Sequence, residues 1–75
     1  MLSLKVTGSV GTSIEQCFLQ MYHLAKVTNC RIEMDWNDIG ELWVYPWGKA
    51  LFYLHDKGCS IDYRFESGKF VEVKK

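Results

Sequence analysis

The sequence predicts an α+β fold in which one amphipathic helix packs on a curved antiparallel sheet, in the order β-α-β-β-β-β-β. Three observations lead to this prediction. Apolar residues recur at three- and four-residue steps near residues 13–28, as on one face of a helix. After that segment the apolar spacing changes to every second residue, which is typical of strands. Glycines then recur at positions 40, 48, 58 and 68, as in a series of short hairpins.

The length and composition indicate one globular domain over residues 1–75. Apolar residues make up 48% of the chain and aromatic residues 15%, so a short chain still has enough apolar surface for a core. Nine basic residues balance nine acidic ones. This neutrality argues against binding of duplex nucleic acid, because that binding depends on a basic surface that neutralises phosphates.

The helix is predicted over about residues 13–28. Its apolar face is made by residues at helical spacing: Ile14, Cys17, Phe18, Met21, Leu24, Ala25 and Thr28. Two overlapping pairs can form a capping box at its start: Thr12 with Glu15, or Ser13 with Gln16. Asn29 follows the last apolar position and is expected to end the helix in the left-handed conformation.

Six strands are predicted from the alternation of apolar and polar residues. They cover residues 2–10, 31–36, 41–46, 49–55, 60–66 and 69–74. The segment 49–57 also fits a short helix capped by Gly58, so strand and helix both remain open there. Because each glycine lies in a polar or proline-containing cluster, we expect hairpin turns with positive φ at the glycines.

The cysteines and histidines do not predict a metal site or a catalytic site. These residues are Cys17, Cys30, Cys59, His23 and His55. Structural zinc sites use pairs of ligands that are close in the sequence. Only His55 and Cys59 are close to each other, and the other three residues are widely spaced. Those two, with Asp56, lie in or beside one predicted tight turn, where side chains do not converge on a sheltered pocket as nucleophilic catalysis requires. We therefore expect a non-enzymatic protein with no metal, no cofactor and no catalytic residue.

The cysteine count also bears on the compartment. An odd number of widely spaced cysteines favours a reducing compartment over a disulfide framework. Residues 1–5 alternate like a strand and do not resemble a signal peptide. No apolar run approaches the roughly 20 residues that a membrane-spanning helix needs. We therefore expect a cytoplasmic protein that does not contact a membrane.

Charged residues on the predicted strands have a simple structural interpretation. Two carboxylate pairs lie beside arginines: Glu33 and Asp35 beside Arg31, and Asp62 and Glu66 beside Arg64. We expect a solvated sheet face with cross-strand ion pairs. The segment 8–11 is glycine-containing and precedes the helix, but it lacks the lysine and the spacing of phosphate-binding loops, which leaves only an anion at the helix start as an option.

The aromatic residues of segment 41–47 give the most informative signal. One face of this segment carries Leu42 and Val44, and the other carries Trp43, Tyr45 and Trp47. The helix needs only one apolar face, so the other is surplus. Either sheet curvature or a homodimer partner buries this strand on both sides, or the aromatics form an exposed recognition surface. We expect Tyr53, with Arg31 or Arg64, to extend that surface.

A single-stranded nucleic acid or a small ligand is a further candidate for the same aromatic surface, because bases stack on aromatic side chains of sheets. That mode normally adds a basic groove, and a neutral chain does not predict one. We therefore expect a protein partner and not a nucleic acid.

Residues 13–46 resemble a pattern found in short bacteriophage accessory proteins. The resemblance lies in three runs: Ile14-Glu15-Gln16-Cys17 through Leu24-Ala25-Lys26, Cys30 through Ile39, and Leu42-Trp43-Val44-Tyr45-Pro46. It implies a host-takeover or anti-defence factor, a group that includes anti-CRISPR proteins, acting by binding a host protein or protein complex. The aromatic-rich second half departs from the pattern, so the resemblance assigns no site residue.

Overall fold

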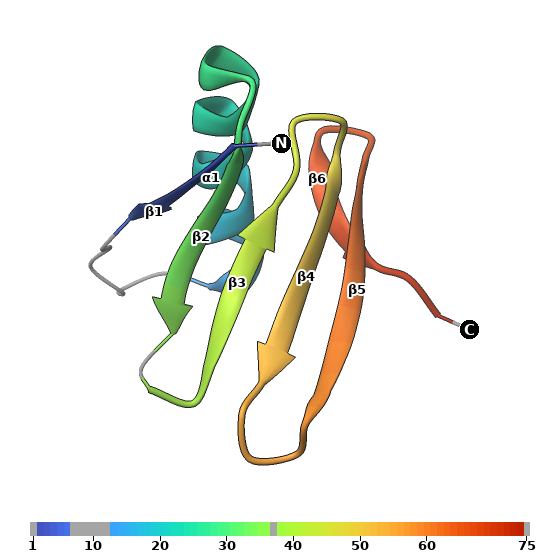
Figure 1. Cartoon of the computed structure of the whole chain (residues 1–75). Helices are drawn as coiled ribbons and strands as arrows, with labels where there is room; N and C mark the ends of the chain where they lie inside the picture. Colours follow the sequence, from blue (N-terminus) through green and yellow to red (C-terminus); the bar gives the residue numbers. More distant parts are fainter. Residues whose placement is uncertain (1, 7–12, 37, 75) are drawn as a thin grey trace.

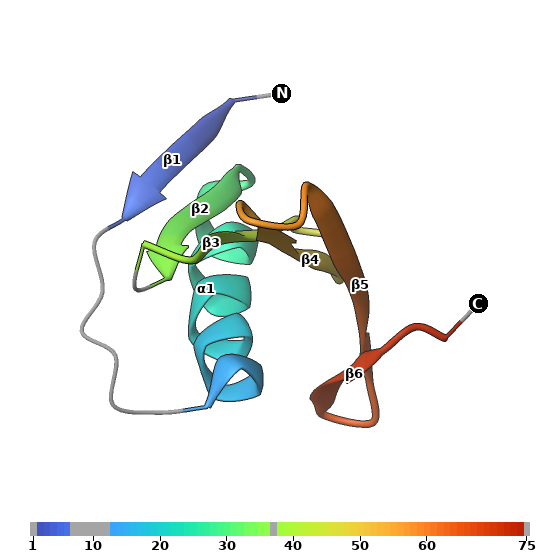
Figure 2. The same cartoon turned by 90° about the horizontal axis from the view of Figure 1, so that it is seen from below.

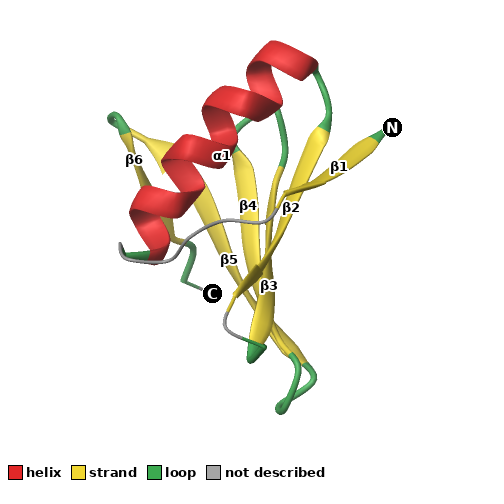
Figure 3. Cartoon of the chain, turned by 90° about the vertical axis from the view of Figure 1, so that its left-hand side faces the viewer, coloured by secondary structure: helices red, strands yellow, loops and turns green. Residues whose placement is uncertain are grey.

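The computed structural model describes residues 2–6, 13–36 and 38–74, and it confirms the predicted α+β class and element order. The elements are β1 (Ser3–Val6), α1 (Ile14–Thr28), β2 (Arg31–Trp36), β3 (Gly40–Val44), β4 (Lys49–Leu54), β5 (Cys59–Glu66) and β6 (Lys69–Glu72). All strands join one six-stranded sheet in the order β1-β2-β3-β4-β5-β6 (Figure 1). The helix α1 lies obliquely across one face of this sheet (Figure 3).

The sheet is antiparallel at every strand pair except the first. Strands β2 to β6 form the predicted meander, because each hairpin places a strand beside the one before it. Strand β1 instead pairs in parallel with β2, with Ser3 opposite Arg31. The chain returns from β1 to β2 through α1, and a connection of this kind brings two strands together in the same direction.

The helix ends are set by local side-chain and backbone chemistry, as predicted. The Gln16 backbone N–H donates to Ser13 Oγ at 3.3 Å, so the second of the two candidate capping pairs forms this contact. Asn29 has a φ of 56° and ends the helix in the left-handed region. Thr12, residues 7–10 of the first predicted strand and the segment 8–11 lie outside the described residues.

The segment with two open interpretations is a strand. Residues 49–54 form β4, which pairs with β3 on one side and β5 on the other. Ala50 and Phe52 are buried two residues apart, the spacing that a strand gives to one face. Pairing with β3 and β5 therefore favours the strand over the short helix, although the local sequence is compatible with both.

The core fills the space between α1 and the inner face of the sheet. It consists of Cys17, Phe18, Met21, Ala25, Ile32, Met34, Leu42, Val44, Ala50, Phe52, Tyr63 and Phe70. The sheet curls around the helix, so that α1 contacts β6 as well as β2 and β3 (Figure 2). The ring centroids of Phe18 and Tyr63 lie 4.8 Å apart, which shows how aromatic residues close the core at the β5–β6 side. The sheet face opposite the helix is consequently convex.

The regular glycines have two different structural roles. Gly48 and Gly68 have φ values of 96° and 82° and allow tight hairpin turns, as predicted. The prediction is wrong for Gly40, which lies within β3 and does not have a positive φ. A Cβ atom there would collide with the backbone carbonyl of Tyr53 and would lie 2.7 Å from the Phe52 ring. Gly40 is therefore required for close approach of β4.

Candidate functional site

Strand β3 buries Leu42 and Val44 on one face and carries Glu41 and Trp43 on the other, while Tyr45 and Trp47 follow the end of the strand. Leu42 and Val44 are fully buried against the helix, and Trp43 between them points to the opposite side of the sheet. We call that side the open face. Its residues on β2 to β5 are Arg31, Glu33, Asp35, Glu41, Trp43, Lys49, Leu51, Tyr53, Ser60, Asp62, Arg64 and Glu66. No described helix or strand covers it (Figure 1).

The four predicted interface aromatics differ in their exposure. Trp43 and Tyr45 are half-buried, Tyr53 is 37% exposed, and Trp47 is 64% exposed. The ring centroids of Tyr45 and Trp47 lie 4.8 Å apart, although Trp47 belongs to the β3–β4 turn and not to a strand. Tyr53 lies on β4, opposite Glu41 of β3. It is two residues along from Leu51, which stands opposite Trp43. We refer to Trp43, Tyr45 and Trp47 as the aromatic stripe.

Arg31 holds the inner end of the stripe in place. Its guanidinium carbon lies 4.5 Å from the centroid of the Trp43 ring and 5.8 Å from that of Tyr45. Two of its N–H groups donate to Glu33 Oε2, at 3.1 and 2.7 Å. The neighbouring Tyr45 side chain is the main cause that raises the pKa of Arg31, with burial opposing it and Glu33 acting in the same direction as Tyr45. Arg31 therefore stays charged and is already occupied by its own neighbours.

Trp43 takes part in the open face through packing of its ring and not through a hydrogen bond of its indole N–H. Its Nε1 atom is buried and, among the described residues, it has no hydrogen-bond partner. An unsatisfied buried donor costs about 1–3 kcal/mol, so this indole is not placed there by its N–H group. The half-buried ring instead packs under Arg31 on the open face. Side chains of the same chain thus cover Trp43 in part, while the outer end of the stripe at Trp47 is left exposed.

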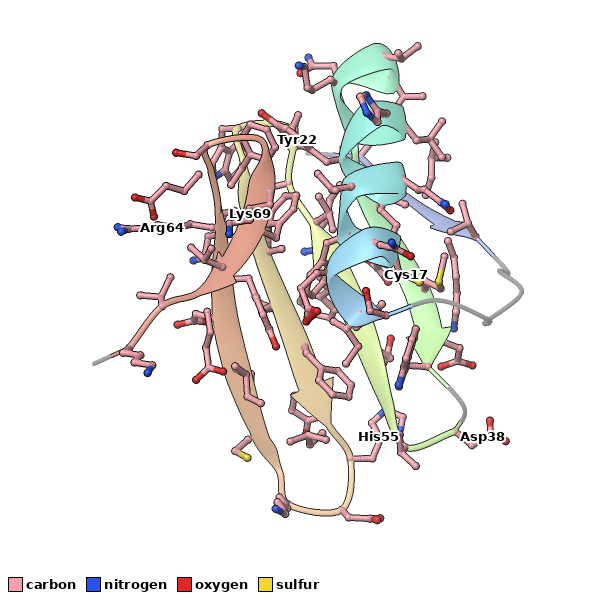
Figure 4. All side chains as sticks on the ribbon, turned by 180° about the vertical axis from the view of Figure 1, so that it is seen from behind. Cys17, Tyr22, Asp38, His55, Arg64 and Lys69 are labelled. Carbon is pink, nitrogen blue, oxygen red and sulfur yellow. The ribbon has the colours of Figure 1, made fainter. Side chains whose placement is uncertain are left out.

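Charged residues of the open face are sorted along the strands. At the end near the β3–β4 turn, Lys49 stands directly opposite Arg64. At the other end Asp35 stands opposite Glu41, whose carboxylate lies 3.3 Å from His55 Nε2. Figure 4 shows His55 at this second end and Arg64 nearer the first, with the Arg64 side chain pointing away from the helix. The end near the β3–β4 turn therefore carries Lys49 and Arg64 with one carboxylate, Glu66, paired to Arg64, and the other end is acidic; we call them the basic end and the acidic end.

The predicted cross-strand ion pairs are wrong. The arginine–carboxylate pairs run along single strands, from Arg31 to Glu33 at 2.7 Å and from Arg64 to Glu66 at 3.1 Å. The register explains the difference, because the residue opposite Arg64 on β4 is Lys49, which cannot pair with it.

The cysteines and histidines are dispersed. Cys17 is buried on α1, Cys59 is exposed at the start of β5, and the Cys30 thiol donates to the Thr28 carbonyl at 3.2 Å. His23 is exposed on the helix. In the part of the chain that the structure describes, no three of the His, Cys, Asp and Glu side chains gather in a way that could hold a metal ion, and no pocket forms.

The arrangement offers aromatic contact area and sorted charge on a convex surface. Sequence reasoning found the aromatic residues but not the sorting of charge, which depends on strand register. Within the described residues, no helix has the length and apolar character that crossing a bilayer requires. Comparison of the chain with protein-family models, with curated proteins and with solved structures finds no match.

Proposed function

We propose that this chain is a non-enzymatic binding protein that docks its open face onto a larger protein and thereby inhibits or adapts it. The observation that carries the proposal is the aromatic stripe, which runs from a half-buried Trp43 to a largely exposed Trp47 on a face that no described element covers. Trp and Tyr are enriched at the centres of protein interfaces, where they supply large contact areas.

The rigidity of the stripe supports the same function. Trp43 and Tyr45 are held by Arg31, and Tyr45 is packed against Trp47. Side chains that are ordered before binding lose little conformational freedom on binding, which leaves more of the contact energy for affinity. A convex sheet face also fits a groove or hollow on a larger partner better than a second convex face, so a host protein is a better-matched partner than a homodimer.

We further propose that the partner is a host protein or protein complex in the cytoplasm, and that the chain acts as a phage accessory factor of the host-takeover or anti-defence kind. The support is the resemblance of residues 13–46 to such proteins. If the gene lies among unrelated housekeeping genes and not among phage or defence-related genes, this part of the proposal is contradicted, whereas binding through the open face is unaffected.

The binding proposal is tested by comparing variants on opposite faces of the molecule. Tagged wild-type chain first captures its partner from a lysate of the host, and the purified partner is then titrated calorimetrically with each variant. Trp47→Ala removes an exposed ring of the stripe, and Val27→Ala is the matched control on the helix, where Val27 is 84% exposed. We expect W47A to weaken binding at least tenfold and V27A to leave it unchanged. Equal affinities for both variants would contradict the proposal.

A further inference from the structure

The basic end of the open face contains a like-charged pair. Lys49 and Arg64 occupy directly opposite positions on β4 and β5, and both side chains are exposed on the same side of the sheet. Like charges directly opposite each other in an antiparallel pair are destabilising. An oppositely charged residue at either position would favour the fold instead. The arrangement therefore costs the isolated chain stability and calls for a separate explanation.

Neighbouring side chains neutralise this pair only in part. Arg64 contacts Glu66 at 3.1 Å, but the two side chains are 63% and 51% exposed, and exposed pairs of this kind contribute little. Among the described residues, no carboxylate lies within 4 Å of the Lys49 ammonium. Its Nζ atom lies 6.0 Å from the centroid of the Tyr45 ring. The ammonium of Lys49 is thus available to an outside anion.

Aromatic residues adjoin the same charges. Tyr45 donates its backbone N–H to the Lys49 carbonyl at 2.7 Å, and the Trp47 ring stacks on Tyr45 at 4.8 Å. The turn is fixed against β5, because the Phe65 N–H donates to the Gly48 carbonyl at 2.9 Å. Two exposed cations, Lys49 on β4 and Arg64 on β5, therefore lie beside the two aromatic rings of the β3–β4 turn. This combination fits a ligand that offers carboxylates together with apolar groups.

We infer that the basic end, formed by Lys49, Arg64, Tyr45 and Trp47, receives an acidic segment of the partner protein, a stretch in which Asp or Glu alternates with apolar residues. The inference rests on the proposed function and names the chemistry of the partner. Charge complementarity gives the orientation as well, since the acidic end at Asp35 and Glu41 repels the same segment and prevents the reversed docking.

A single-stranded nucleic acid fits this face less well. Its backbone carries a phosphate at every nucleotide and needs a continuous basic path. On the open face, Asp62 lies two residues from Arg64 along β5, and Glu33 lies two residues from Arg31 along β2, so the Cα atoms of each pair are about 7 Å apart. These carboxylates interrupt a basic path across the face. A short acidic peptide can place its few charges on Lys49 and Arg64 alone.

The test uses the whole chain with two labelled probes, fluorescein-octaglutamate and fluorescein-oligo(dT)8, followed by fluorescence anisotropy at low salt. Lys49→Glu replaces the like-charged pair with an opposite-charge pair. Lys57→Glu is the matched control, because Lys57 is an exposed lysine in the β4–β5 turn beyond the acidic end. Urea denaturation of both variants reports the fold separately.

We expect the wild type to bind octaglutamate more tightly than oligo(dT)8, and K49E to weaken that binding at least tenfold while K57E changes it less than twofold. K49E should also raise the urea midpoint, since it removes the repulsion from Arg64. Binding of the oligonucleotide in preference to the peptide, equal losses for K49E and K57E, or no binding of octaglutamate would each overturn the inference. Loss of a wild-type dimer on K49E substitution, seen by sedimentation, would assign the basic end to a second copy and overturn it as well.

Failure of this inference and failure of the proposed function have different signatures. If the captured partner loses affinity for W47A but not for K49E, the open face binds the partner and the acidic segment is excluded. If neither substitution affects the captured partner, the open face is not the docking surface.

Discussion

The guanidinium of Arg31 stacks on the ring of Trp43, 4.5 Å from its centroid, while its Nε and Nη2 groups donate to Glu33 Oε2. This relationship joins β2 to β3 on the face that the helix leaves open. It provides a rigid base for Tyr45 and Trp47, and it explains why an aromatic residue can stand on that face without collapsing into the core.

Replacing Arg31 tests this support. Arg31→Ala removes the stack on Trp43 and the charge-assisted contact with Glu33, so we expect the free energy of unfolding in urea to fall by about 1–2 kcal/mol. Arg31→Lys should recover only part of the loss, because an ammonium lacks the planar fork. Arg64→Ala is the control, since Arg64 and Glu66 form an exposed pair and the change should be near zero. Comparable losses at both arginines would contradict this account.

Substitutions at Trp43 and Trp47 separate packing from exposure. Trp43→Phe removes an indole N–H that has no partner among the described residues, so we expect a stability change within about 1 kcal/mol. Trp43→Ala should cost about 2 kcal/mol because a half-buried ring is lost, and Trp47→Ala less than about 0.5 kcal/mol. Thermal unfolding followed by circular dichroism measures all three. A W47A loss as large as that of W43A would show that Trp47 is part of the core.

The fold was predictable because its signals are local. The helix of residues 14–28, the Ser13 cap and the Asn29 stop depend on signals a few residues apart, and all three are present in the structure. The predicted apolar face is wrong at Leu24, which is 38% exposed. The parallel pairing of β1 depends on where the chain returns after α1, and no local pattern encodes that. The same holds for Gly40, whose role comes from the close approach of Tyr53 on another strand.

The candidate site was predictable only in part, for a related physical reason. Alternation along one strand identifies Trp43 and Tyr45 as surplus aromatics. The position of Lys49 opposite Arg64, in contrast, follows from the register between two strands. A shift of one residue would move Lys49 to the other face, so charge sorting across a sheet cannot be read from either strand alone.

Tyr63 gives the fold a dependence on alkaline pH. Burial, with Glu15 and Glu72 acting in the same direction, raises the pKa of Tyr63. The folded chain therefore holds the phenol proton more tightly than the unfolded chain, whose Tyr pKa is about 10. The stabilisation is complete below that pH and is lost as pH rises through the folded-state value. We expect unfolding free energy to decline in this range and Tyr63→Phe to reduce the decline. An identical decline in Y63F would assign the effect to other groups.

Two glycine substitutions distinguish close approach from turn geometry. Gly40→Ala places a Cβ against the Tyr53 carbonyl and the Phe52 ring, and backbone there cannot move without breaking the β3–β4 pairing. We expect a loss of about 3 kcal/mol or more. Gly68→Ala meets open space but has a φ of 82°, so the loss should be about 1–2 kcal/mol. Urea denaturation compares them, and a smaller loss for G40A than for G68A would contradict the structure.

In the proposed complex the open face, and not the helix, contacts the partner. Amide cross-saturation in the complex with the captured partner tests this most directly, because irradiating the partner attenuates only nearby amides. We predict attenuation at Tyr45, Trp47 and Lys49 and at Tyr53, with none at Leu24 or Val27 on the exposed side of α1. Attenuation confined to α1, with the β3–β4 hairpin unaffected, would place the partner on the helix and exclude docking through the open face.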